Sequence, residues 1–337
     1  MKKKLYLFYL IVPFLFILYT LNANSELKTD ELIAKNKNPA TVWLENGKKE
    51  FDKKNYTKAI ENYTKAIKLN PYYAEAYNNR GLAYYHNFQY DLAMNDYNKV
   101  ITLKPADPEV YYNRGLIYYD KGQYTFAIKD YTKAIALKPN YHDAYYNRGL
   151  AYYHNWQADI AIKDYTKAIA LKPVNPDAYN NLGIIYYEKG MYDVAIKNYN
   201  KAIDLKSDNS DAYNNLGNAY YSKEEYDIAI MNYTRAIDLK PDFPEAYNNR
   251  GASYLKREET DKAIRDYNKA VELNPGYAEP YYNLACIYSL KNEKGIALLY
   301  LEKAIICNPG KCKPIAKNDT DFNNIKDDVR FQKLLRN

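Results

Sequence analysis

The sequence has few of the residues that build catalytic and metal centres. It contains only 3 His, 3 Cys and 2 Trp among 337 residues. His86 and His154 occupy equivalent places two repeats apart in a 34-residue repeat. Helices packed about 8–10 Å apart would hold them on the order of 20 Å from each other, too far to share a metal. No nucleophile elbow and no phosphate-binding glycine loop occurs. The sequence therefore predicts no enzyme, no cofactor and no metal site.

Three cysteines are too few for a disulfide framework. Two interpretations stay open for them. In the first, Cys307 and Cys312 form a disulfide across the intervening NPGK and leave Cys286 unpaired. In the second, Cys286 and Cys307 are small core residues. The sequence favours the second interpretation.

Charge is mild, with a formal net value of +7, which does not indicate a nucleic-acid partner. The N-terminus combines MKKK with an uncharged apolar run from Leu5 to Leu21, interrupted by Pro13. This layout is typical of a cleaved export signal, with an uncleaved anchor or a buried N-terminal helix as alternatives. We expect residues 1–23 to be a signal peptide or N-terminal membrane anchor and residues 24–39 a linker. The protein is then exported (periplasmic or secreted) or membrane-tethered by residues 5–21, and it meets the membrane only through this segment.

Tyrosine is abundant, with 42 Tyr against 9 Phe, and much of it recurs at a fixed interval. Glycine, alanine, tyrosine and proline all return every 34 residues, and this self-similarity predicts a repeat architecture. The four ladders are Gly47, Gly81, Gly115, Gly149, Gly183, Gly217 and Gly251; Ala59, Ala93, Ala127, Ala161, Ala195, Ala229, Ala263 and Ala297; Tyr63, Tyr97, Tyr131, Tyr165, Tyr199, Tyr233 and Tyr267; and Pro71, Pro105, Pro139, Pro173, Pro241, Pro275 and Pro309.

Each repeat predicts two helices. In the third repeat, PEVYYNRGLIYYD and YTFAIKDYTKAIALK are joined by KGQ. Apolar residues of the second segment recur at i, i+3, i+4 and i+7, as on one face of a helix. The following proline ends that helix, because it lacks an N–H and restrains the residue before it.

These ladders resemble the tetratricopeptide repeat family. That family has aromatic residues at positions 4 and 24, Gly or Ala at 8, Tyr at 11, Ala at 20 and 27, and Pro at 32. The resemblance implies an all-α, right-handed superhelix (an α-solenoid) of eight helix-turn-helix repeats over residues 40–311, followed by a C-terminal cap over residues 312–337. The repeats span 40–73, 74–107, 108–141, 142–175, 176–209, 210–243, 244–277 and 278–311. A capping helix is expected within Asp319–Leu335.

Small residues at positions 8, 20 and 27 let two helices approach closely, and the rings at positions 4, 11 and 24 fill the space around them. We therefore expect the rings at positions 4 and 11 of the third and fourth repeats to belong to the core. These are Tyr111, Tyr118, Tyr145 and Tyr152.

The resemblance implies that one face of the first helices lines a concave, ligand-binding groove. Position 6 on that face is Asn in seven of the eight repeats. A carboxamide offers a donor and an acceptor to the backbone of an extended peptide; the alternative is bonding within the array. The candidate residues are Asn79, Asn113, Asn147, Asn181, Asn215, Asn249 and Asn283.

Tyrosines flank this row at positions 12 and 5. They either contact a ligand, as rigid amphipathic rings do in binding sites, or are partly buried under the next repeat. They are Tyr85, Tyr119, Tyr153, Tyr187 and Tyr221 at position 12, and Tyr112, Tyr146 and Tyr282 at position 5.

Charged residues also recur. The acids at position 2 either complement the dipole of the helix that they begin or form an acidic rim. The position 7 arginines (Arg80, Arg114, Arg148 and Arg250) bridge neighbouring repeats or extend to the rim. Basic residues at position 26 accompany Asp96, Asp130, Asp164 and Asp266 at position 23, which predicts a solvated outer face.

The sequence thus favours a non-enzymatic scaffold that binds a protein or an extended peptide in the groove of a tetratricopeptide superhelix. The alternative is a structural assembly or adaptor protein of a cell-envelope complex that binds through its convex face or its ends. The identity of the partner and the oligomeric state stay open.

Overall fold

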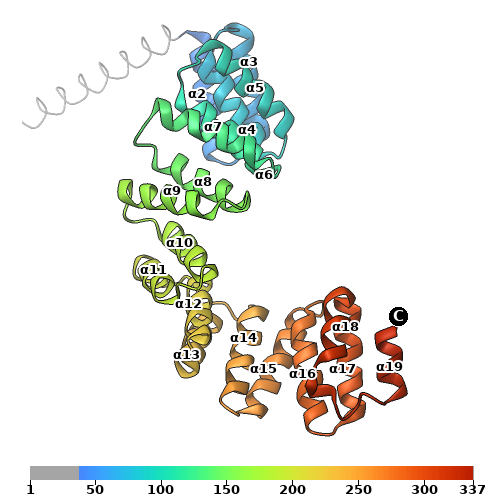
Figure 1. Cartoon of the computed structure of the whole chain (residues 1–337). Coiled ribbons are helices and arrows are strands. Elements are labelled where there is room, and N and C mark those ends of the chain that lie inside the picture. Colours follow the sequence, from blue (N-terminus) through green and yellow to red (C-terminus); the bar gives the residue numbers. More distant parts are fainter. Residues whose placement is uncertain (1–37, 337) are drawn as a thin grey trace, which may run out of the picture. The chain divides into compact units, whose positions relative to one another are not determined.

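The computed structural model describes residues 38–336, and every regular element there is helical. The predicted signal or anchor and most of the predicted linker lie outside this part of the chain. Two compact units divide it, residues 38–155 with helices α2–α8 and residues 156–336 with α9–α19 (Figure 1). Each unit consists of helices that pack on their neighbours along the chain. The all-α repeat fold expected from the sequence is confirmed.

The first helices of the repeats are α2 (Pro39–Asp52), α4 (Ala74–His86), α6 (Pro108–Asp120), α8 (His142–His154), α10 (Pro176–Glu188), α12 (Ser210–Ser222), α14 (Pro244–Lys256) and α16 (Ala278–Leu290). The second helices are α3 (Tyr56–Leu69), α5 (Tyr90–Leu103), α7 (Tyr124–Leu137), α9 (Ala158–Leu171), α11 (Tyr192–Leu205), α13 (Tyr226–Leu239), α15 (Thr260–Leu273) and α17 (Lys294–Cys307). The chain ends in α18 (Pro309–Asn318), the 3-10 turn η1 (Thr320–Phe322) and α19 (Val329–Arg336).

The third repeat shows how local sequence sets the helix ends. Asp107 caps α6 by accepting a hydrogen bond from the Glu109 backbone N–H at 3.0 Å, and Pro108 opens the helix, where its missing N–H costs nothing. The helix closes with bonds from Gly122 N to Tyr119 O and from Gln123 N to Tyr118 O, the Schellman pattern. This motif needs a left-handed residue, and Gly122 has a φ of 69°. Phe88 fills the same position in the second repeat with a φ of 57°.

The core between the two helices of a repeat is built on the position 24 tyrosines. Within the first unit, Tyr63, Tyr97 and Tyr131 are 0–1% exposed, and each ring lies against the glycine of the preceding helix. The core therefore depends on a bulky ring facing a residue that has no side chain. The rings at positions 4 and 11 differ from the expectation, because only Tyr111 is buried while Tyr118, Tyr145 and Tyr152 are half-buried.

The C-terminal cap also differs from the single helix expected within Asp319–Leu335. Asp319 accepts a hydrogen bond from the Asp321 backbone N–H at 3.0 Å and starts η1. Asp328 accepts one from Arg330 N at 2.8 Å and starts α19. Two capping carboxylates thus break the segment into two short helical pieces, because each offers the backbone a local helix start. Phe322, Ile325 and Phe331 are buried as a cap requires, whereas Val329 is 80% exposed.

Candidate binding face on the first helices

The position 6 asparagines lie on the first helices and are half-buried in every repeat that has one. Most of them donate a hydrogen bond to the position 5 residue of the preceding repeat. Asn113 Nδ2 donates to Asn78 Oδ1 at 3.3 Å, and Asn147 Nδ2 donates to the Tyr112 hydroxyl at 3.0 Å. The same bond joins Asn215 to Asn180 at 3.2 Å, Asn249 to Asn214 at 3.2 Å and Asn283 to Asn248 at 3.3 Å. The amide nitrogens therefore bond within the array, the alternative that the sequence left open.

The carboxamide oxygens have a different environment. Those of Asn113, Asn215 and Asn283 accept no hydrogen bond from the described residues, and none of them is fully enclosed. Because the nitrogen of each group is held by the neighbouring repeat, the oxygen has a fixed direction. The first helix of each of these three repeats thus presents an oriented acceptor.

The position 12 tyrosines are also half-buried, and some link consecutive repeats. The Tyr85 hydroxyl donates to Asp120 Oδ2 at 2.7 Å, and the hydroxyls of Tyr187 and Ser222 lie 3.0 Å apart. Burial, followed by the hydrogen bond to Asp120, raises the pKa of Tyr85 above its ordinary value. The Tyr119 ring packs against Tyr124 at 5.6 Å, and Tyr221 packs against Tyr226 at 5.4 Å. Tyr153 meets the ring of His154 at 5.4 Å.

Position 5 contributes further half-buried tyrosines. The Tyr112 ring lies 5.0 Å from Tyr141 and 5.9 Å from Tyr131. Burial, with a smaller contribution from the Asp143 carboxylate, raises the pKa of Tyr112 to about 12, so its hydroxyl stays protonated at neutral pH. Tyr146 is half-buried in the equivalent place of α8. Each tyrosine at positions 5 and 12 therefore has one part of its side chain packed against neighbouring residues and another part exposed to solvent.

The arginines at position 7 bridge neighbouring repeats, one of the two alternatives that the sequence offered, because Arg80, Arg148 and Arg250 each donate to a threonine of the preceding repeat. Arg114 forms a two-pronged ion pair with Asp130, both bonds at 2.7 Å, and donates to Asn98 of the preceding repeat at 2.7 Å. Its guanidinium lies 5.8 Å from the Tyr111 ring and 5.9 Å from the Tyr118 ring. The expectation that the position 23 carboxylates lie on a solvated outer face is wrong, because all four are buried and Asp96, Asp130 and Asp266 pair with these arginines. Asp96, Asp130, Asp164 and Asp266 are only 4–7% exposed.

The sequence contains a pattern that indicates the pairing of position 7 arginines with position 23 aspartates. Repeats with Arg at position 7 have Asp at position 23, whereas the fifth and sixth repeats have Leu at position 7 and Asn at position 23. Leu182 and Leu216 are buried, and Asn198 and Asn232 bond the carbonyl four residues back at 2.8 Å. The two pairs are therefore alternative ways to fill one site.

Charges at the helix ends also connect repeats. Lys121 pairs with Asp91 at 2.7 Å, and within the second unit Lys189 pairs with Asp159 at 2.9 Å and Lys223 with Asp193 at 2.8 Å. The position 2 acid Glu75 pairs with Lys48 at 2.9 Å. These exposed pairs connect consecutive repeats but contribute little stability each.

One group within residues 38–336 could together ligate a metal ion, namely Cys286, Asp319 and Asp321, whose ligand atoms lie within 4.8 Å of one another. Asp319 is already engaged, since it accepts from the Tyr282 hydroxyl at 2.7 Å and caps η1. Burial, then the nearby Asp319 and Asp321 carboxylates, raises the pKa of the Cys286 thiol. All three cysteines are free thiols, and Cys312 is buried, so the Cys307–Cys312 pairing is not formed. In residues 38–336, none of the helices combines the length and apolar content that crossing a membrane requires.

The fold and this face define a class, the solenoids built from two-helix repeats. The family model described as TPR repeat matches residues 47–87, 89–122, 115–155, 157–190, 183–223 and 217–257. Two models described as tetratricopeptide repeat match residues 244–277 and 266–298. The chain belongs to the tetratricopeptide repeat family. These models describe a structural repeat, and none of them describes an enzyme.

Solved structures give the same fold. The C-terminal part of a TPR repeat-containing protein from Cytophaga hutchinsonii is 22% identical over 73% of this chain and 98% of that one, with a TM-score of 0.57. In the Cut9–Hcn1 complex of the APC/C, the matched chain is 18% identical over 83% of this chain, with a TM-score of 0.57, and this chain covers 52% of that chain's length. MamA is 32% identical over 48% of this chain and 94% of that one, with a TM-score of 0.45. The comparison with curated proteins finds no match.

Proposed function

We propose that this protein is a non-enzymatic scaffold that holds an extended segment of a partner protein along the first helices of its repeats. The row of oriented carboxamides carries the proposal. The amide nitrogens of Asn113, Asn215 and Asn283 are bonded to the preceding repeat, and their oxygens have no partner among the described residues. An extended backbone supplies N–H donors at regular intervals, so such a row suits it whatever its side chains are.

Fixed orientation favours binding by this row. A free Asn side chain loses rotamer freedom when it contacts a ligand, whereas these side chains are already held by the neighbouring repeat. The tyrosines beside them add contact area. The hydroxyls of Tyr119 and Tyr221 donate no hydrogen bond within residues 38–336, so they are available to a ligand. The proposal therefore combines backbone recognition with sequence-tolerant aromatic contact.

We further propose that the protein acts outside the cytoplasm or on a membrane surface. This proposal rests on the basic start and the apolar run of residues 5–21 in the sequence. The second candidate function, assembly of a cell-envelope complex through the outer face or the ends, is favoured by the exposed apolar side chains of α17. Leu299 is 50% exposed and Ile306 is 74% exposed.

Two matched triple variants test the binding face. The first carries Asn113→Ala, Asn215→Ala and Asn283→Ala. The control carries Asn78→Ala, Asn180→Ala and Asn248→Ala, the acceptors of the same three bonds. Both variants lose identical inter-repeat hydrogen bonds, but only the first loses the row of oxygens. Circular dichroism and thermal unfolding establish that their folds and stabilities match.

The tagged full chain first captures partners from source-cell extract. The captured partner is then titrated against each variant to give its dissociation constant. We expect the first variant to bind at least about tenfold more weakly than the control, because each hydrogen bond is worth about 0.5–1.5 kcal/mol. Binding by the first variant as tight as that of the wild type would exclude recognition by the oxygen row. Binding would then lie on the outer face or the ends, and the assembly function would replace the proposed one.

A further inference from the structure

The second helix of the last repeat has large apolar side chains at two exposed positions where most of the other second helices are polar. Leu299 and Ile306 of α17 are 50% and 74% exposed. In the seven preceding repeats, the residues aligned with Ile306 are Lys68, Thr102, Ala136, Ala170, Asp204, Asp238 and Glu272, and those aligned with Leu299 are Glu61, Asn95, Lys129, Lys163, Lys197, Met231 and Arg265. Apolar side chains on the outer side of a helix, as well as on its inner side, favour contact with a further partner. The outer edge of α17 is therefore suited to contact with another protein.

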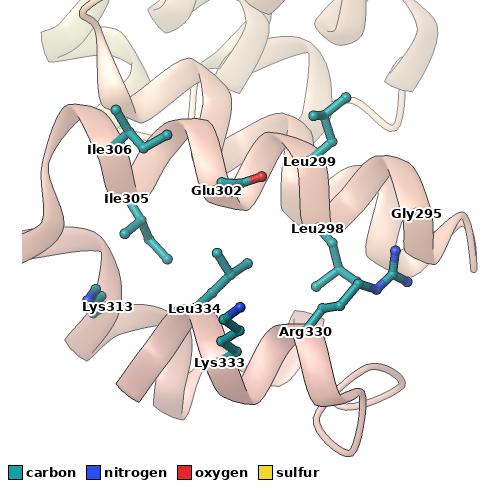
Figure 2. Close-up of a pocket in the computed structure, with 10 residues that line it drawn as sticks. All are labelled: Gly295, Leu298, Leu299, Glu302, Ile305, Ile306, Lys313, Arg330, Lys333 and Leu334. Atoms are coloured by element: carbon teal, nitrogen blue, oxygen red, sulfur yellow. The ribbon is translucent and has the colours of Figure 1, made fainter. Parts of the chain in front are cut away.

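A groove lies along this edge, between α17 and α19. Its volume is about 610 Å³, within the usual range for binding pockets. Figure 2 shows α17 on one side of the groove, and Lys333 and Leu334 pointing from α19 toward it. Leu298 and Ile305 form the buried floor and continue into the core of the last repeat. The groove is thus a continuation of the hydrophobic core that is open to solvent.

The rim of the groove is basic. Lys313 of α18 and Arg330 and Lys333 of α19 line it, against the single carboxylate of Glu302. Arg330 is paired with Asp328 at 3.2 Å. Lys313 and Lys333 form no ion pair within the described part of the chain. A ligand with carboxylates beside an apolar face would therefore be attracted by the two lysines.

The geometry points to a partner's acidic amphipathic α-helix as the occupant. Leu299 and Ile306 are seven residues apart on α17, which is two helical turns or about 10.5 Å. Apolar side chains at i, i+3 or i+4 and i+7 of an incoming helix match that length, and ridges of one helix pack into the grooves of another. A small amphiphile suits the site less well, because pockets for such ligands enclose most of their surface, whereas Ile306 is largely open. We propose that this groove is a second docking site, separate from the asparagine row.

The probe is a fluorescent helical peptide of about four turns with leucines on one face and glutamates beside them. Its counterpart has lysines in place of the glutamates. Fluorescence anisotropy with the full chain gives both dissociation constants at low salt. We expect the glutamate peptide to bind at least about tenfold more tightly, and the difference to shrink as salt screens the lysines. Equal binding of the two peptides would overturn the proposal.

Two variants locate the site on the protein. Ile306→Glu introduces the residue that the preceding repeat has at the aligned position, Glu272, so the helix accommodates it. Ile296→Glu, at a residue of the same helix that is 40% exposed and outside the groove, is the matched control. We expect Ile306→Glu to weaken binding of the glutamate peptide at least about tenfold and the control to leave it unchanged. An equal effect of both variants would contradict the proposal.

Two further measurements distinguish this groove from the asparagine row and from a self-association surface. The Asn113, Asn215 and Asn283 triple variant should bind the peptide normally, since the groove does not include the asparagine row; a loss of binding would contradict the proposal. Analytical ultracentrifugation of the wild type and Ile306→Glu shows whether a second copy of the chain occupies the groove. Self-association that Ile306→Glu abolishes would replace the partner helix with a second copy and overturn the proposal.

Discussion

Gly115 of α6 lies directly against the buried ring of Tyr131 in α7. A Cβ atom on Gly115 would fall 2.6 Å from Tyr131 Cε1 and 2.9 Å from Cδ1. Within the first unit, Gly47 meets Tyr63 and Gly81 meets Tyr97 in the same way. The pairing of Gly at position 8 with Tyr at position 24 is therefore the contact that closes these helix pairs.

Substitution of this glycine should destabilise the protein. Gly115→Ala gains up to about 1 kcal/mol of helix propensity, but the added methyl group displaces a ring that is 0% exposed. Overpacking of this kind typically costs about 1–3 kcal/mol, and we expect a net loss in urea unfolding. Gly295→Ala in α17 is the control, because no atom lies within 4 Å of its added Cβ, and it should not lower stability. An unchanged midpoint for Gly115→Ala would mean that Tyr131 moves freely.

The tyrosine hydroxyls in this core are not equivalent. Tyr131 Oη is buried without a hydrogen-bond partner among the described residues, whereas the Tyr233 hydroxyl donates to Asn218 Oδ1 at 2.8 Å. Tyr131→Phe removes an unsatisfied polar group and should be neutral or stabilise the protein by about 1 kcal/mol. Tyr233→Phe should destabilise it by about 1 kcal/mol. Thermal unfolding of both variants checks the contrast, and equal losses would contradict it.

Asp130 should matter mainly because it balances Arg114. Their side chains are only 5% and 19% exposed, so Asp130→Ala leaves a largely buried guanidinium without its carboxylate. We expect a loss of about 3 kcal/mol in the free energy of unfolding. The double variant Arg114→Leu with Asp130→Asn reproduces the pair found in the fifth and sixth repeats and should recover most of that loss. A double variant as unstable as Asp130→Ala would show that the two pairs are not interchangeable.

The protein should unfold at alkaline pH as its core tyrosines ionise. Burial raises the pKa of Tyr97, Tyr131, Tyr233 and Tyr267 well above the ordinary value of about 10. Because the folded pKa is raised, this stabilisation is fully present below pH of about 10 and is lost as the pH rises toward the folded pKa. Each buried tyrosine then lowers the free energy of unfolding by about 1.4 kcal/mol per pH unit.

The measurement for this prediction is a parallel titration of tyrosinate absorbance and helical circular dichroism. The buried tyrosines should ionise only as the helical signal disappears. Complete tyrosine ionisation in a fully helical protein would show that these rings are accessible to hydroxide.

The repeat fold could be predicted from the sequence, because each helix pair depends on contacts between residues at constant spacing. Gly115 and Tyr131 are sixteen residues apart, and the same spacing joins Gly81 to Tyr97. Helix ends also follow from local sequence, since Asp107 and Pro108 mark the start of α6 and Gly122 adopts the left-handed conformation just after its end. The cap was predicted less well, because Asp319 and Asp328 begin two short helical pieces where apolar periodicity suggested one helix.

The sequence alone determined the family, the period and the residues on each helix face, because all of these follow from local propensity and a fixed repeat. Tertiary structure decided how each side chain uses its polar atoms. Asn113 turns its nitrogen to the preceding repeat and leaves its oxygen available, and Asp130 is buried against Arg114 instead of facing solvent. Tertiary structure also placed α19 beside the apolar edge of α17, so that a groove with a basic rim lies between the two helices. These outcomes depend on distances between residues far apart in the chain, which a one-dimensional pattern does not contain.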